Sequence, residues 1–263
     1  RRVLFRSGNT MKKLIVLTYG VINYNLGSMG LVALIAFLFN LIPANPYFNG
    51  IDAGESGNGI VALVINIGLI ALFGLQHSVM ARPRFKQWLT RYIPQHAERS
   101  TFMLATAIVT FALIVLWQPV PTTVWQADSL IAYNTLLTVG LLGWALVFYS
   151  TFQINHFDLF GLRQVWLYFR GKPNTQLPFQ VSGLYRYIRH PIMTGALIGI
   201  WVTPVMTVGH LVFALGMSLY ILIGVYHEEK DLIRAFGDKY RAYIQSTGKF
   251  IPERARKGRL ART

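Results

Sequence analysis

Long apolar runs separated by shorter polar stretches define the chain. A helix needs roughly 20 mostly apolar residues to cross the hydrocarbon core of a bilayer. Six runs approach that length, and they cover residues 14–41, 58–79, 100–118, 129–152, 191–206 and 208–227. We therefore expect an all-α polytopic integral membrane protein with about six membrane helices. The fifth run is short and contains Pro204, so a helical hairpin, or five spans and a re-entrant piece, stays open for the last two runs.

The composition agrees with lipid as the main solvent. Charged residues make up 13% of the chain and hydrophobic residues 53%, whereas soluble domains carry about 25% charged residues. There is no cysteine, which excludes disulfides, thiolate metal sites and a cysteine nucleophile.

The basic residues indicate how the chain is oriented in the membrane. Segments 1–13, 82–99 and 153–190 carry five lysines and arginines each, and the tail after residue 227 carries ten, which together account for all 25. With six spans, every basic residue falls on one side of the membrane. By the positive-inside rule that side is the cytosol, and both termini lie there. The net charge of +15 therefore indicates contact with anionic lipid and argues against a nucleic-acid partner.

The domain organisation expected from these runs is simple. Residues 1–10 precede Met11 and are treated as an extension outside the fold. Residues 11–247 form a single helical membrane domain, and residues 248–263 form a basic cytosolic tail. Within the 82–99 loop, apolar residues recur at helical spacing among basic ones, which predicts a short interfacial helix.

Histidines gather at one level of the predicted bundle. Five of the six fall at the cytosolic boundary or just beyond it: His77, His96, His156, His190 and His227. Each alone is more often structural than catalytic, but their common level favours a site. Histidine pairs of the HxxxH or HxxHH type, which place metal ligands on one helical face, do not occur in the sequence. We expect no metal centre.

The segment GLYRYIRHPIMTG, residues 183–195, carries the strongest signal for a site. Pro191 suits the first turn of a helix, where its missing N–H costs nothing. The unpaired N–H groups of that turn, beside Arg189 and His190, form an anion site. Gly195, one turn later, would let a ligand approach the backbone. The alternative is a basic membrane-entry sequence with a proline helix start.

A second polar segment, YHEEKDLIRAFGDKYRAY, follows the last apolar run at residues 226–243. Glu228 and Glu229 come directly after that run, and a carboxylate at that depth needs a partner such as Arg189, Lys230 or a ligand. Tyr240 and Tyr243 are three residues apart, so both can share one helical face. An ordinary solvated amphipathic helix is the competing interpretation.

Together these segments resemble a known family. RHPxxxG, followed about 33 residues later by EE and then by FGxxYxxY, resembles the membrane methyltransferases of the isoprenylcysteine carboxyl methyltransferase type. In that family the two segments bind S-adenosylmethionine. The family usually has tyrosine at the position of Met193, which argues against a prenylcysteine substrate here.

A narrower resemblance, from the first span to about residue 247, is to the bacterial methanethiol S-methyltransferases. It includes QHSVMARPRFK (76–86), AERS (97–100), INHFDLFGLRQVW (154–166), RHPIMTG (189–195), WVTPVMTVGHLVFA (201–214) and EEKDL (228–232). It implies methyl transfer from S-adenosylmethionine to methanethiol, giving dimethyl sulfide, at the cytosolic side of a bacterial inner membrane. The front half also resembles NnrU-type proteins, an assignment against which the tail segment argues.

The resemblance and charge matching imply roles for individual residues. Arg189, His190 and the helix start at Pro191 and Gly195 would hold the cofactor carboxylate, and Glu228 or Glu229 its amino group or ribose hydroxyls. Tyr185, Tyr240 and Tyr243 would pack on adenine or face the sulfonium. His156, with Asn155 and Asp158 nearby, is the first candidate for the base that deprotonates the thiol, and His77 is the second. Two alternatives stay open: another acceptor (a larger thiol, a prenylcysteine carboxylate or a phospholipid amine), or a non-enzymatic NnrU-like protein.

Overall fold

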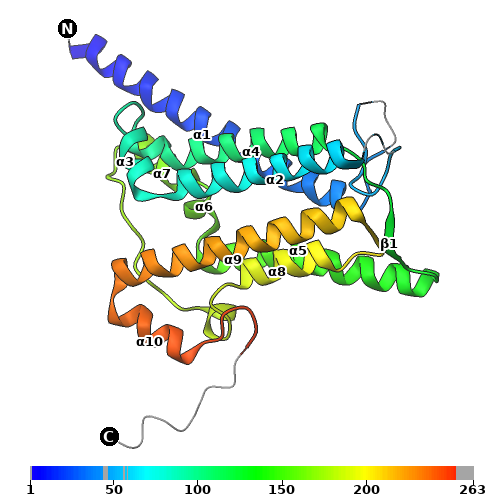
Figure 1. The fold of residues 1–263 in the computed structure, drawn as a ribbon. Helices are drawn as coiled ribbons and strands as arrows, with labels where there is room; N and C mark the ends of the chain where they lie inside the picture. Colours follow the sequence, from blue (N-terminus) through cyan, green and yellow to red (C-terminus); the bar gives the residue numbers. More distant parts are fainter. Residues whose placement is uncertain (1, 44–46, 56, 58, 253–263) are drawn as a thin grey trace, which may run out of the picture. The chain divides into compact units, whose positions relative to one another are not determined.

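The structure, a computed structural model, describes residues 2–43, 47–55, 57 and 59–252, and within them the chain is mostly helical (Figure 1). The α-helices are α1 (Arg2–Leu38), α2 (Gly59–Ala81), α3 (Pro83–Leu89), α4 (Glu98–Leu116), α5 (Leu130–Ile154), α6 (His156–Leu159), α7 (Leu162–Phe169), α8 (Pro191–Trp201), α9 (Val208–Phe236) and α10 (Asp238–Ser246). Two 3-10 turns, η1 (Gln95–Ala97) and η2 (Gly183–Arg186), and two paired strands, β1 (Thr123–Gln126) and β2 (Val205–Thr207), complete the described elements.

Among the described residues, five helical segments are long and apolar enough to cross a membrane. They are Thr10–Leu38 of α1, α2, Gln95–Leu116 (which joins η1 and α4), α5 and α9. The prediction of an all-α polytopic integral membrane protein is therefore confirmed. The short interfacial helix expected in the 82–99 loop corresponds to α3, which begins with Pro83 at its first helical position.

The run predicted at 191–206 contains a helix of only 11 residues, α8. At 1.5 Å per residue its length is about 16 Å, roughly half of a hydrocarbon core of about 30 Å. The helix ends at Trp201 because Thr203 precedes Pro204 and is therefore disfavoured in helical geometry. Trp201 Nε1 donates a hydrogen bond to Ser218 Oγ of α9 at 2.8 Å, so the unequal helices α8 and α9 contact each other. The number of crossings and the side of the termini stay predictions.

Packing divides the chain into two compact units. Unit 1 holds the described residues of 1–124, 155–177 and 206–213, and unit 2 holds those of 125–154, 178–205 and 214–263. The region expected as one domain over 11–247 thus contains two units, and residues 248–252 belong to unit 2 together with α10.

In unit 1, α4 packs against both α1 and α2, and α7 packs against α1 (Figure 1). Glycines of α1 allow this close approach, since a Cβ on Gly20 would lie 2.5 Å from Val165 and one on Gly27 would lie 2.2 Å from the Met103 side chain. Small residues at helix interfaces are the usual device by which membrane helices gain packing contacts. The position of α7, and of α6 directly before it, is therefore fixed against α1.

A buried carboxylate, Asp52, ties the loop after α1 to the start of α9 within unit 1. Its Oδ1 accepts hydrogen bonds from Thr207 N and Oγ1 at 3.1 and 2.7 Å. Its Oδ2 accepts from Asn40 Nδ2 at 2.9 Å and from His210 Nδ1 at 3.1 Å. Burial alone would raise the pKa of Asp52, but the hydrogen bond and charge of His210, with the other donors, lower it. Asp52 therefore remains an anion that holds this end of unit 1 together.

In unit 2, α5 and α8 cross with almost no space between their backbones. A Cβ on Gly143 of α5 would lie 2.7 Å from Gly199 N and 2.8 Å from Gly195 O. A Cβ on Gly199 would lie 2.4 Å from Trp144 Nε1. The three glycines therefore set the depth at which α8 packs on α5, and α8 in turn carries the RHP segment at its start.

We predict that Gly143→Ala destabilises the protein, because the new methyl group meets backbone atoms that cannot turn away. Overpacking of this kind costs about 1–3 kcal/mol. Gly224→Ala in α9 is the matched control, since a Cβ there would meet nothing within 4 Å. Thermal unfolding of both variants in detergent, followed by circular dichroism, measures the difference. Equal midpoints for the two variants would contradict this packing.

Candidate active site

A partly buried carboxylate, Glu229, lies at the centre of the polar cluster of unit 2. Its Oε1 accepts hydrogen bonds from Arg189 Nε at 2.9 Å and from His190 Nε2 at 3.0 Å. Its Oε2 lies 3.1 Å from Lys249 Nζ. The side chains of Arg189, His190 and Glu229 are only 8, 5 and 13% exposed. Polar contacts this well shielded from water are strong, so Glu229 fixes Arg189 and His190. The Lys249 side chain is 41% exposed, so its ion pair with Glu229 is weaker.

Local sequence explains why Arg189 and His190 lie at the start of a helix. His190 is the N-cap of α8, and Pro191 follows it as the first helical residue. The first hydrogen bond of the helix runs from Thr194 N to the carbonyl oxygen of His190 at 3.0 Å. The N–H groups of residues 192 and 193 therefore have no carbonyl partner within the helix, and they point out of its N-terminus. Pro191 therefore begins a helix beside two basic side chains, as the sequence predicted.

The segment after α10 pairs with the RHP segment. Arg189 N donates to Gly248 O at 2.8 Å, and His190 N donates to Lys249 O at 3.1 Å. The Arg189 guanidinium also donates to the carbonyls of Ile244, at 3.1 Å, and Thr247. Sequence analysis missed Lys249, because it is one of ten basic residues in the tail and no pattern distinguishes it.

Glu228 differs from its neighbour Glu229 in environment. Its side chain is 50% exposed, and its Oε2 lies 3.6 Å from His190 Nδ1. The structure therefore separates two adjacent acids that the sequence could not distinguish. Glu229 is enclosed by basic partners, whereas Glu228 presents its carboxylate at the surface of the same cluster.

Two of the three candidate tyrosines, Tyr240 and Tyr243, form an aromatic group with Phe179, which sequence analysis did not single out. Phe179 lies 5.8 Å from the ring of Tyr240 and 5.6 Å from that of Tyr243, and the two tyrosine rings are 5.7 Å apart. Tyr243 Oη donates to the carbonyl oxygen of Tyr185. Tyr240 is 2% exposed and Tyr243 9%, so both are packed inside unit 2, whereas Tyr185 is half-buried.

The hydroxyls of these tyrosines stay protonated at neutral pH. Burial raises the pKa of Tyr185 and of Tyr240, and nearby carboxylates, Glu228 for both, raise them further. Burial raises the pKa of Tyr243 to about 12. None of the three can act as a general base near pH 7.

Gly195 lies on the face of α8 that contacts α5. A Cβ at this position would lie 2.5 Å from Gly143 O and 2.9 Å from Val147 N. The space that the sequence suggested for a ligand is, in this direction, filled by the α5 backbone. A role for Gly195 in cofactor binding stays a prediction, while its role in helix packing is visible.

The first candidate base, His156, is the first residue of α6 in unit 1 and is 6% exposed. Its Nε2 lies 2.7 Å from the hydroxyl of Tyr24 on α1. Burial lowers the pKa of His156 from its ordinary value. The imidazole is therefore neutral at physiological pH and able to accept a proton.

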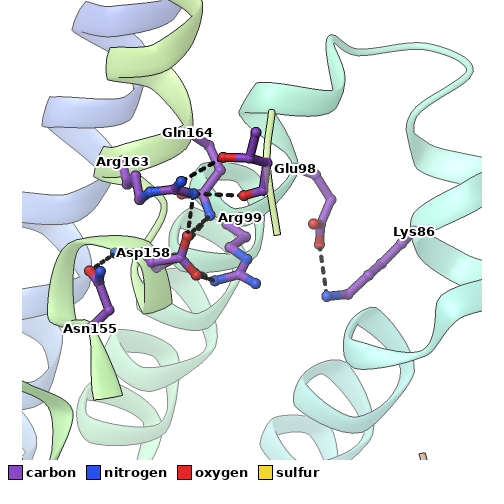
Figure 2. Close-up of polar contacts among 8 residues, drawn as sticks. Lys86, Glu98, Arg99, Asn155, Asp158, Arg163 and Gln164 are labelled. Carbon is purple, nitrogen blue, oxygen red and sulfur yellow. Dashed lines mark hydrogen bonds and ion pairs between the residues drawn. The ribbon is translucent and has the colours of Figure 1, made fainter. Parts of the chain in front are cut away.

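The turn that presents His156 is braced by Asp158 (Figure 2). Asn155 caps α6 by accepting from Asp158 N at 3.0 Å. The Asp158 carboxylate binds Arg99 at 2.7 Å, Arg163 at 3.0 Å and Gln164 at 3.0 Å. Figure 2 shows these side chains converging from α4 and α7 on the one acid. Asn155 and Asp158 thus hold the short helix that begins with His156.

The second candidate base, His77, lies within α2 among aromatic rings. Its ring stacks on Phe73 at 5.4 Å and meets the edge of Phe102 at 4.6 Å, and Thr106 Oγ1 is 3.4 Å from its Nδ1. Both candidate bases belong to unit 1 and all nine candidate cofactor residues to unit 2. Across residues 2–43, 47–55, 57 and 59–252, no three His, Asp or Glu side chains gather in a group that could hold a metal ion.

Comparison with known proteins identifies relatives over most of the chain. The family model described as NnrU protein matches residues 65–255. A methanethiol S-methyltransferase of Crocosphaera subtropica is 41% identical over 247 residues, which cover 94% of this chain and 95% of that protein. One of Mycobacterium tuberculosis is 41% identical over 242 residues, 92% of this chain and 98% of that protein. Nurim of Sus scrofa is 29% identical over 181 residues, 66% of this chain and 69% of that protein. No solved structure matches the chain.

The matched range corrects one inference from the sequence. The NnrU match extends to residue 255 and so includes Glu228, Glu229 and the segment of α10. The tail therefore does not argue against the NnrU family, as the sequence had suggested. The resemblance to methanethiol S-methyltransferases is confirmed by relatives that align with more than nine-tenths of the chain.

We predict that Glu229→Gln destabilises unit 2 far more than Glu228→Gln. Removal of the Glu229 charge leaves Arg189 and His190 buried without their anion, and breaking such a buried pair costs about 3–5 kcal/mol. Removal of the charge of the half-exposed Glu228 should lower the free energy of unfolding by less than about 1 kcal/mol. Thermal unfolding of the two variants in the same detergent measures the contrast. Similar losses in both variants would show that Glu229 does not hold the cluster together.

Proposed function

The chain belongs to the NnrU protein family and to the methanethiol S-methyltransferases, and from this premise we propose that it methylates methanethiol with S-adenosylmethionine to give dimethyl sulfide. The observation that carries the proposal is the cluster around Glu229, in which two fixed basic side chains and a helix N-terminus adjoin an exposed acid. The zwitterionic amino-acid end of the cofactor needs that combination of charges.

The residues of the cluster fit the two ends of that zwitterion. Arg189, His190 and the first-turn amides of α8 supply donors for a carboxylate. Because Glu229 is enclosed by basic partners, we assign the cofactor amino group or ribose hydroxyls to Glu228, whose side chain is 50% exposed. Glu229 then acts by orienting Arg189 and His190.

One candidate tyrosine is accessible enough to contact the cofactor. Tyr185 is half-buried, whereas Tyr240 and Tyr243 are packed in the core of unit 2. We therefore assign adenine or sulfonium contact to Tyr185, since aromatic faces attract cations. The hydrogen bond from Tyr243 to the Tyr185 carbonyl holds the backbone of Tyr185 in place.

The bound cofactor would supply a methyl group that its sulfonium already activates. The chain's own residues must align the thiol, exclude water and remove the thiol proton. Thiols titrate well above pH 7, so a base is useful. His156 is the first candidate because it is buried and neutral, and His77 is the second. Methanethiol is small and apolar and can reach the site from the lipid.

The proposed setting is the cytosolic side of a bacterial inner membrane. All 25 lysines and arginines lie in four segments that six crossings would bring to one side. That distribution is what the positive-inside rule requires for a cytosolic site. The cofactor is made in the cytosol, and the proposed site residues lie next to the basic segments.

Activity of the purified protein in detergent tests the proposed function. The protein is incubated with methyl-labelled S-adenosylmethionine and methanethiol, and labelled dimethyl sulfide is measured in the headspace. Reactions without thiol, with a larger thiol and with a prenylcysteine serve as controls for the acceptor. Labelled dimethyl sulfide formed only with protein and methanethiol supports the proposal. Cofactor binding without any methylated product would contradict it.

We predict that Glu228→Gln weakens cofactor binding about tenfold, because one charge-assisted hydrogen bond, worth about 1.4 kcal/mol, is lost. The half-exposed position should leave the unfolding midpoint nearly unchanged. Asp238→Asn at the start of α10 is the control, since its side chain is 95% exposed and pairs with Arg241. Isothermal titration of both variants with S-adenosylhomocysteine gives the affinities. An unchanged affinity in Glu228→Gln would remove Glu228 from the site.

We predict that the acid limb of the pH profile of kcat/KM has its midpoint below pH 6.5, the ordinary value for histidine. The reason is that burial lowers the pKa of His156, and only the neutral form accepts the thiol proton. In His156→Gln this limb should vanish and turnover should rise with pH as free thiolate accumulates. Turnover in His156→Gln that matched the wild type across the pH range would exclude His156 as the base.

A further inference from the structure

We propose that Lys249 is a further cofactor-binding residue, whose ammonium group contacts the carboxylate of S-adenosylmethionine. The inference rests on the proposed function, because it takes S-adenosylmethionine as the ligand of the cluster around Glu229. The sequence placed Lys249 in the basic tail after residue 247, among ten lysines and arginines that follow residue 227. The contacts that support a role for Lys249 all lie within unit 2.

The backbone of Lys249 is held beside the start of α8. Its carbonyl oxygen accepts a hydrogen bond from His190 N at 3.1 Å. The next carbonyl oxygen, that of Phe250, accepts from Thr194 Oγ1 at 2.7 Å, and Thr194 lies in the first turn of α8. Lys249 is therefore bonded to the element at which the cofactor carboxylate is placed, and its position is defined on both sides.

The Lys249 side chain is the most accessible of the three basic side chains around Glu229. It is 41% exposed, whereas those of Arg189 and His190 are 8 and 5% exposed. Its Nζ lies 3.1 Å from Glu229 Oε2, and an ammonium group has three N–H donors. A lysine with this exposure can keep one donor on Glu229 and offer another to a ligand.

The two buried basic side chains already donate to protein atoms. Arg189 Nε donates to Glu229 at 2.9 Å, and its Nη1 donates to the carbonyl oxygens of Ile244 and Thr247. His190 Nε2 lies 3.0 Å from Glu229 Oε1. A carboxylate that meets Arg189 or His190 therefore finds few remaining donors there, and Lys249 supplies a further one.

The charges of the cluster give the effect of Lys249 a sign. Glu228 and Glu229 carry two formal negative charges, and Arg189 and Lys249 carry two formal positive ones. Without Lys249 the acids outnumber these two cations, so an incoming carboxylate is repelled more strongly. A ligand that lacks the carboxylate should not respond in this way.

Lys249→Gln tests the inference with two ligands that differ in one group. S-Adenosylhomocysteine carries the carboxylate, and decarboxylated S-adenosylhomocysteine is the same molecule without it. We expect the Kd for S-adenosylhomocysteine, measured by isothermal titration in detergent, to rise about tenfold, the effect of losing one hydrogen bond to a charged group. The Kd for the decarboxylated ligand should stay within about twofold of the wild-type value. Equal losses for both ligands would show a structural role for Lys249 and overturn the inference.

Lys239→Gln is the matched control. It removes the same charge from an exposed residue of α10 in the same unit, so it reports the effect of net charge alone. We expect both ligands to bind Lys239→Gln as they bind the wild type. Lys249→Arg, which keeps the charge at the site, should lose less affinity for S-adenosylhomocysteine than Lys249→Gln.

Chemical labelling of the wild type gives a second readout that needs no variant to fold. Acetic anhydride acetylates accessible lysine amines, and mass spectrometry of the peptides measures the extent at each position. We expect saturating S-adenosylhomocysteine to protect Lys249 and the decarboxylated ligand to leave it reactive, with Lys239 labelled equally in both. Equal labelling of Lys249 with and without S-adenosylhomocysteine would overturn the inference.

These measurements use no thiol acceptor and so separate the inference from the proposed function. Selective loss of S-adenosylhomocysteine affinity in Lys249→Gln, with a wild type that makes no dimethyl sulfide, would support the role of Lys249 and refute the proposed function. Equal Kd values for S-adenosylhomocysteine in the wild type and Lys249→Gln would overturn the role of Lys249, and the proposed function would stand.

Discussion

A carboxylate largely held away from water needs hydrogen-bond donors and positive charge around it, and Glu229 meets this constraint with Arg189, His190 and Lys249. Transfer of an unpaired carboxylate into a medium of low dielectric constant costs many kcal/mol. Arg189 and His190, both nearly buried, offset that cost together with the more exposed Lys249, and the three come from both the segment before α8 and the tail after α10. The cluster therefore joins these segments to α9 and fixes the start of α8. The other features of the candidate site in unit 2 depend on that arrangement.

The same constraint gives the two adjacent acids different roles. Glu229 is enclosed and orients its neighbours, whereas Glu228 presents its carboxylate at the surface. The cluster thus combines basic groups and a helix N-terminus with an exposed acid. The proposed cofactor, which carries a carboxylate, an ammonium group and an aromatic base, matches this combination in charge. In unit 1, one acid likewise binds several partners. Asp158 accepts hydrogen bonds from Arg99 and Arg163 and holds the helix that begins with His156.

The parts of the fold that depend on local sequence were predictable. Apolar runs marked the five long helices, because a membrane span needs a long apolar stretch and little else. Pro191 marked a helix start, and the depth of Glu228 and Glu229 indicated that a partner such as Arg189 was required. The end of α8 at Trp201 was less apparent, although Pro204 pointed to a short helix.

The parts that depend on tertiary contacts could not be read from one sequence. Lys249 is one base among many in the tail, and only its pairing beside His190 distinguishes it. Tyr24 lies in a long apolar run, far in sequence from the histidine it contacts. Gly195 suggested room for a ligand, but the backbone of α5 fills the space beside it, because the same residue type serves close helix packing and ligand approach. The tail also failed to separate the NnrU family from the methyltransferases, since the family match includes it.

The most direct test of the central claim is a structure of the protein with S-adenosylhomocysteine bound. The account predicts that the ligand carboxylate lies within about 3 Å of donors on Arg189 or His190, while Glu229 keeps its ion pair with Arg189. Glu228 should then contact the amino group or the ribose. A ligand bound elsewhere, or one whose amino group replaces Arg189 on Glu229, would contradict the account.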